Sequence, residues 1–209
     1  MSDIEKCFKD LEEYIVEVEI QYLDSHLHTI EQPDDYKYDI KTYCILCHAA
    51  FEEFIESVCI CILKEIYDNF VNNQRISFST MCLLHFMTNT SELNDTTWPN
   101  NQMLFDYFKN NIQKIKSDLS TFIIKNNHGI NLKYLKKLLL PLGLNIPQDV
   151  ILQNSLSQLA NCRGGFAHTS NRSSKRLSPE DAKKYVDDVF AMMKNIALKA
   201  RHIHYYSIH

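Results

Sequence analysis

Apolar residues recur at steps of three and four along most of the chain, which is the spacing of amphipathic helices. The first stretch of this kind covers residues 4–27 and has an acidic outer face. The second runs from about residue 36 or 39 to residue 70, and it is almost wholly apolar over residues 43–61. A helix that is apolar on several faces contacts neighbours on more than one side. We therefore expect the second helix to lie at the centre of the fold.

The pattern is weaker around residues 72–145. We expect this stretch to be an insertion within a single helical domain that spans residues 1–209. Its expected elements are a short helix or connector over residues 76–87, a polar loop over residues 88–101, a helix over residues 103–115 and a basic helix over residues 131–140. The loop holds the only tryptophan, Trp98, which is expected to fill a packing gap.

Two helix signals follow the insertion. Residues 148–161 form an apolar periodic run, and a last helix is expected to continue to about His202. Ser178 suits the N-cap of this last helix, with Pro179 at its first position and Asp181 as the acid of its first turn. The chain has no convincing strand pattern and no glycine-rich phosphate loop after a strand. The predicted fold class is therefore all-α, a bundle of four to five core helices.

Composition limits the class of protein. Only 4 glycines and 5 prolines in 209 residues leave few turns, which favours long helices. No apolar run approaches the roughly 20 residues that span a bilayer, and the charged first ten residues lack the apolar core of a signal peptide. We therefore expect a cytoplasmic protein with no membrane partner.

The charge is unevenly distributed. The first 100 residues carry 19 acidic and 6 basic side chains, whereas the remainder carries 7 acidic and 16 basic ones. This asymmetry suggests an anion-binding side, such as a surface for nucleic acid. Alternatively, the two surfaces neutralise each other within the fold or across a dimer.

The seven cysteines offer a metal hypothesis and a simpler one. Cys44 and Cys47, with His48 beside them, have the two-residue gap of a zinc ligand pair. However, they lie inside a helical apolar pattern, and no second pair follows at finger-like spacing. Reduced thiols in a helical core are the better interpretation, and we predict no metal site.

The candidate chemistry centres on Arg163 and His168, which stand five positions apart with Gly164 and Gly165 between them. On an unbroken helix these positions are about 140° apart, so the two side chains would not share a face. We expect the helix to end or loosen at the glycines, which would allow both side chains to converge on one anion. The alternative is a C-cap turn with a solvated arginine and an incidental histidine.

The Arg163-x4-His168 pattern at a helix end, together with the helix start at residues 178–181, resembles the HEPN superfamily of all-helical domains. Residues 48–55, which include Glu52, resemble the acidic helix of the RiboL-PSP type and related toxin-like branches. Active members usually place Asn, Asp or His directly after the arginine, whereas this chain has Gly164 there.

The resemblance implies a metal-independent endoribonuclease without a cofactor. It would cleave RNA by attack of the 2′-hydroxyl, at a composite site formed by a homodimer. Arg163 would stabilise charge, His168 would transfer protons and Glu52 would orient the arginine. The resemblance to toxin-like branches further implies a toxin or antiviral defence effector, restrained by an antitoxin or another regulatory protein.

Two further functions stay open from the sequence. The first is a non-catalytic HEPN module that binds RNA or a nucleotide through Arg163 and a basic loop. The basic residues of that loop are Arg172, Lys175 and Arg176. The second is a helical interaction protein that assembles through its acidic and basic faces.

Overall fold

A computed structural model describes residues 2–30, 32–87, 101–125, 129–168 and 177–207. Its helices are α1 (Asp3–Tyr22), η1 (Asp24–His26), α2 (Pro33–Val71), α3 (Phe78–Met87), α4 (Asn101–Lys125), α5 (Leu132–Leu139), η3 (Leu140–Leu142), α6 (Val150–His168) and α7 (Pro179–Arg201). The prediction of an all-α fold is confirmed. Trp98 and the basic loop residues Arg172, Lys175 and Arg176 lie outside the described residues.

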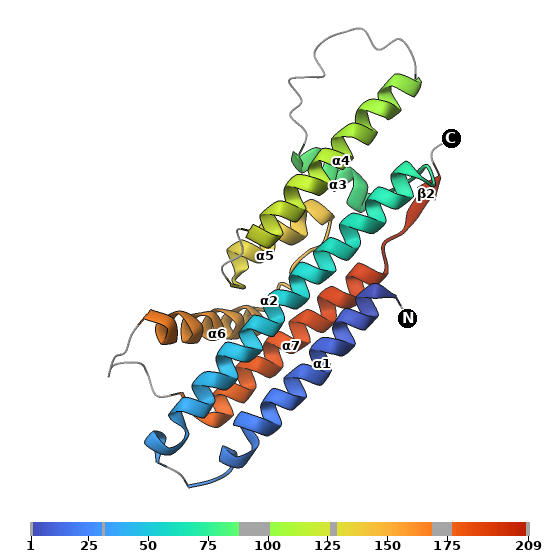
Figure 1. Ribbon diagram of the computed structural model, residues 1–209. Coiled ribbons are helices and arrows are strands. Elements are labelled where there is room, and N and C mark those ends of the chain that lie inside the picture. The colour runs from blue at the N-terminus through green and yellow to red at the C-terminus, as the bar shows by residue number, and fades with distance from the viewer. Residues whose placement is uncertain (1, 31, 88–100, 126–128, 169–176, 208–209) are drawn as a thin grey trace.

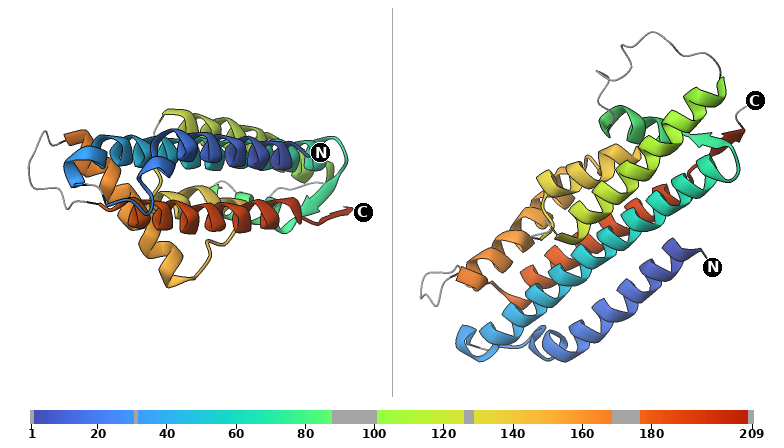
Figure 2. Two further views of the ribbon diagram at one scale, coloured as in Figure 1. Left: turned by 90° about the horizontal axis from the view of Figure 1, so that it is seen from below. Right: turned by 45° about the horizontal axis from the view of Figure 1, so that its top comes forward.

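α2 is the central helix of the fold, as its apolar pattern predicts. It is 39 residues long, and α1, α4, α6 and α7 all contact it (Figure 1). α1 and α7 lie alongside α2 in every view, so the three form one layered bundle (Figure 2). Pro33 begins the helix, because a proline in the first turn lacks only an N–H that would have no helical partner.

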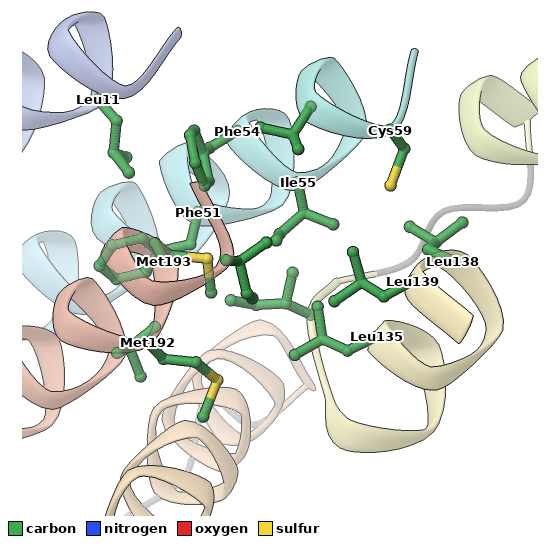
Figure 3. Close-up of a cluster of buried hydrophobic side chains, with 14 of the residues drawn as sticks. Leu11, Phe51, Phe54, Ile55, Cys59, Leu135, Leu138, Leu139, Met192 and Met193 are labelled. Atoms are coloured by element: carbon green, nitrogen blue, oxygen red, sulfur yellow. The ribbon is translucent and has the colours of Figure 1, made fainter. Parts of the chain in front are cut away.

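The core joins α5 to the main bundle. Figure 3 shows three leucines of α5 pointing toward side chains of α2 and α7, among them Phe51, Ile55 and Met193. The leucines, Leu135, Leu138 and Leu139, are fully buried. Burial of each such side chain contributes roughly 1.5–3 kcal/mol. This packing holds α5 in place and therefore also holds the two residues before its N-cap, Gly129 and Ile130.

Several element boundaries differ from those predicted. α1 ends at Tyr22, and a short 3₁₀ turn replaces its last residues. α4 extends ten residues beyond the predicted helix end at 115, to Lys125, because the buried stripe continues through Leu119 and Ile123. Two short strands, β1 (Arg75–Ser77) and β2 (Tyr205–Ser207), pair antiparallel and were missed. Three residues are too few to produce a recognisable alternating pattern.

Charged side chains pair between the first and last helices. Lys183 of α7 bonds Glu19 of α1, and Arg201 Nη1 lies 2.6 Å from Glu5 Oε1. Ser178 caps α7 by accepting the N–H of Asp181, as predicted. Part of the charge asymmetry between the two halves of the chain is thus neutralised within the fold.

Three further features concern membrane spans, thiols and metal ligands. Within the described ranges, every helix is too short or too polar to cross a membrane. The seven cysteines are free thiols, and burial raises the pKa of Cys47 and Cys59. Across the same ranges, no three His, Cys, Asp or Glu side chains stand together as ligands for a metal ion.

Candidate functional site

Arg163 and Glu52 meet where α6 packs on α2. Arg163 Nη2 lies 3.8 Å from Glu52 Oε2, although the two residues are far apart in sequence. The side chain of Glu52 is 16% exposed, and that of Arg163 is 37% exposed. The carboxylate is thus largely withdrawn from water, while part of the arginine remains accessible. A carboxylate in this position can hold and orient the arginine cation.

The second oxygen of Glu52 is bound by the backbone of the connection between α4 and α5. The N–H of Gly129 donates to Glu52 Oε1 at 2.7 Å. Hydrogen bonds to a carboxylate are stronger than bonds between neutral groups. The two oxygens of Glu52 therefore face two different segments, which fixes the direction of the carboxylate.

His48 lies one helical turn before Glu52 and forms the buried wall of the site. It is 1% exposed, and its Nδ1 lies 3.9 Å from Glu52 Oε2. Its Nε2 lies 3.3 Å from the carbonyl oxygen of Ile130, which can only accept, so Nε2 carries the proton. In the neutral ring Nδ1 is then unprotonated, and this buried atom has no hydrogen-bond partner among the described residues.

His48 is a neutral imidazole at pH 7. Burial, and secondly the positive charge of Arg163, lower its pKa to about 4, and the hydrogen bond to Ile130 only partly opposes this. Three segments of the chain thus meet at one place: α2 with His48 and Glu52, Gly129 before α5, and α6 with Arg163.

Gly129 has a backbone conformation that side chains other than glycine rarely adopt, with φ at +100°. A Cβ atom built on it would overlap Arg163 Nη1 and lie 2.9 Å from His48 Cε1. The space that a side chain would fill is therefore already occupied by the arginine and the histidine.

α6 is bonded to α7 on one side and to α2 on the other. Ser155 donates a hydrogen bond of 2.6 Å to Asp188 Oδ2 of α7, and Leu156 and Leu159 are fully buried. The thiols of Cys162 and Cys44 are hydrogen-bonded between α6 and α2, which lowers the pKa of Cys162. These contacts set the position of Arg163, the residue after Cys162.

The prediction that the helix ends at Gly164 and Gly165 is wrong. α6 continues without a break from Val150 to His168. Two glycines within a helix cost roughly 1 kcal/mol each, which the packing of α6 on α2 and α7 can outweigh. Positions 163 and 168 are therefore about 140° apart around the helix axis, and one chain does not present both on the same face.

The sequence interpretation missed two members of this cluster. His48 appeared only as the first residue of the acidic helix and as a neighbour of Cys47. The spacing of four between His48 and Glu52 puts both on one helix face and could have paired them. Gly129 falls between the helices predicted over residues 103–115 and 131–140, and nothing local points from it to a glutamate 77 positions earlier.

The all-helical fold, with a basic and an acidic residue paired between two packed helices, agrees with a HEPN domain. The family model described as RiboL-PSP-HEPN matches residues 3–200. The chain therefore belongs to the RiboL-PSP-HEPN family, and this membership supports a HEPN-type nuclease or RNA-interacting role. No curated protein and no solved structure matched the sequence.

Proposed function

We propose that this protein is a metal-independent endoribonuclease of the HEPN type, acting as a homodimer. The observation that carries the proposal is Arg163, whose guanidinium is paired with Glu52 and whose side chain is 37% exposed. Arginine remains charged at all working pH values and presents a planar fork to phosphate oxygens. Arg163 binds the scissile phosphate and stabilises the negative charge that develops on it.

Cleavage follows from attack of the ribose 2′-hydroxyl on the neighbouring phosphorus. A base removes the 2′ proton, the new O–P bond forms, and the bond to the 5′ oxygen breaks as that oxygen gains a proton. The products are a 2′,3′-cyclic phosphate and a 5′-hydroxyl. His168 transfers these protons, because histidine has an ordinary pKa near working pH.

The homodimer solves a geometric problem within the single chain. Positions 163 and 168 are about 140° apart on the unbroken α6, so one chain cannot easily turn both toward one phosphate. Pairing Arg163 of one subunit with His168 of its partner removes this conflict, and two-fold pairing is the commonest oligomeric state.

On the resemblance to toxin-like members, we assign the enzyme to toxins or antiviral defence effectors of the cytoplasm. An antitoxin or another regulatory protein restrains it.

A cleavage assay on synthetic RNA with a chelator present tests the chemistry. Arg163→Ala and His168→Ala are each expected to lower the rate by roughly 10²–10⁴-fold. RNA with 2′-deoxy substitution is expected to resist cleavage. Arg201→Ala and His202→Ala serve as matched controls, because these side chains lie at the far end of α7 and should leave the rate unchanged. Equal rates in all four variants would exclude the assigned roles.

Mixing the two inactive variants tests the shared site. A dimer with one Arg163→Ala subunit and one His168→Ala subunit keeps one complete arginine and histidine pair, so activity should reappear on mixing. Solution scattering checks the dimer independently. A strict monomer, or mixed dimers that remain inactive, would remove the composite site from the mechanism.

A second candidate is RNA binding without cleavage, and Gly164 favours it. Active relatives carry a polar residue at this position, whereas glycine supplies no side chain. In the same assay, this function would appear as salt-dependent retention of intact RNA by the wild-type protein.

A further inference from the structure

We propose that Gly129 is a positioning residue for Arg163, and that residues 129–131, directly before α5, form a structural part of the site. Its N–H holds Glu52, and its missing side chain leaves the space that the arginine occupies. This inference deepens the proposed function, and its claim about RNA cleavage rests on that function. The claim that Gly129 sets the position of the Arg163 guanidinium does not depend on catalysis.

Arg163 is confined by two neighbouring groups. The Glu52 carboxylate attracts it from α2, and its Nη1 lies, beside the His48 ring, where a Cβ of Gly129 would stand. Glu52 is itself bound by the Gly129 N–H at 2.7 Å. The same glycine therefore limits the arginine directly by contact and indirectly through the carboxylate.

Residues 129–131 have little freedom to withdraw from the arginine. Asn131, two residues after Gly129, caps α5 by accepting the N–H of Tyr134 at 2.9 Å. The carbonyl oxygen of Ile130 binds buried His48, and the leucines of α5 are packed in the core. A side chain added at Gly129 would therefore push away the more mobile partner, which is the end of the long Arg163 side chain.

Gly129→Ala is the decisive variant, and Gly143→Ala is its matched control. Both glycines have a positive φ, +100° and +71°, so both substitutions strain the backbone. A Cβ at Gly143 would meet the Phe78 ring at 3.1 Å and the backbone of Ser79. None of these groups belongs to the cluster around Arg163. Loss of stability is expected in both variants, whereas displacement of Arg163 is expected only in Gly129→Ala.

Two measurements separate this inference from the proposed function. Gly129→Ala is expected to lower kcat/KM for RNA cleavage by roughly 10²-fold, the scale of an ångström of misplacement, and Gly143→Ala should not. NMR titration of the His48 ring reports on the guanidinium without any need for catalysis. Because Arg163 lowers the pKa of His48, Gly129→Ala should raise that pKa toward the value in Arg163→Ala.

The titration decides the inference even if the wild-type protein does not cleave RNA. A His48 pKa in Gly129→Ala equal to that in Gly143→Ala would overturn it. Should Gly129→Ala fail to fold, Glu52→Gln and Glu52→Ala replace it. Both remove the charge, but only glutamine keeps an acceptor for the Gly129 N–H. The inference expects weaker perturbation of the His48 signals in Glu52→Gln, and equal perturbation would refute it.

Discussion

Acidification should destabilise this protein through His48. In the folded chain the pKa of His48 is about 4, against an ordinary value of 6.5. The unfolded state therefore binds the proton more tightly than the folded state, and the free energy of unfolding falls as pH drops between these values. The separation between the two pKa values corresponds to about 3 kcal/mol, of which about 2 kcal/mol is already lost at pH 5.

Urea denaturation of wild type and His48→Gln, repeated from pH 7 to pH 4, measures this loss. Glutamine does not titrate, and its amide can still donate to the Ile130 carbonyl oxygen in place of Nε2. Every other titratable group is common to both proteins, so the difference between the two pH profiles isolates His48. His48→Gln should start less stable at pH 7 and lose less stability on acidification.

Parallel profiles for the two proteins would refute the reasoning. They would mean that the folded state accepts a proton on His48 at little cost, for example by pairing the protonated ring with Glu52, 3.9 Å from Nδ1. The cost of burying the protonated ring and its repulsion by Arg163 would then both be smaller than a His48 pKa of about 4 implies.

Two further substitutions test the last helix and the basic loop before it. Ser178→Ala removes the acceptor for the Asp181 N–H and should cost about 1 kcal/mol in urea denaturation. Ser178→Asp should restore most of it, since aspartate also caps helices, and an equal loss in both would reject the cap. Joint substitution of Arg172, Lys175 and Arg176 by alanine should weaken RNA binding across sequences and reduce its dependence on salt. Unchanged binding in a filter assay at several salt concentrations would mean that these three side chains contact only solvent and do not bind RNA.

Local signals account for most of what the sequence predicted correctly. The apolar pattern around residues 43–61 predicted the central helix, and the Ser178-Pro179 start predicted α7, because caps and periodicity depend on neighbours a few positions away. The family was also identified from short motifs, and the family model supports it. The extent of the insertion and the catalytic roles of Arg163, His168 and Glu52 stay predictions.

The end of α6 shows where local reasoning fails. Two adjacent glycines are a reasonable signal for a helix end, but a helix that packs on α2 and α7 can continue through them. The strands β1 and β2 show the same limit, since their pairing joins residues more than 120 positions apart.

The sequence by itself determined the all-helical class, the central position of α2 and the candidate arginine, because each depends on residue type and helical period. Only the tertiary structure decided that His48 and Gly129 stand with Arg163 and Glu52. Their contacts join α2, α6 and the connection before α5, which are brought together by burial of the shared core. The low pKa of His48 arises from that burial and from the Arg163 charge. The burial of His48 and its proximity to Arg163 both depend on how distant segments pack, and residue spacing along the sequence does not predict that packing.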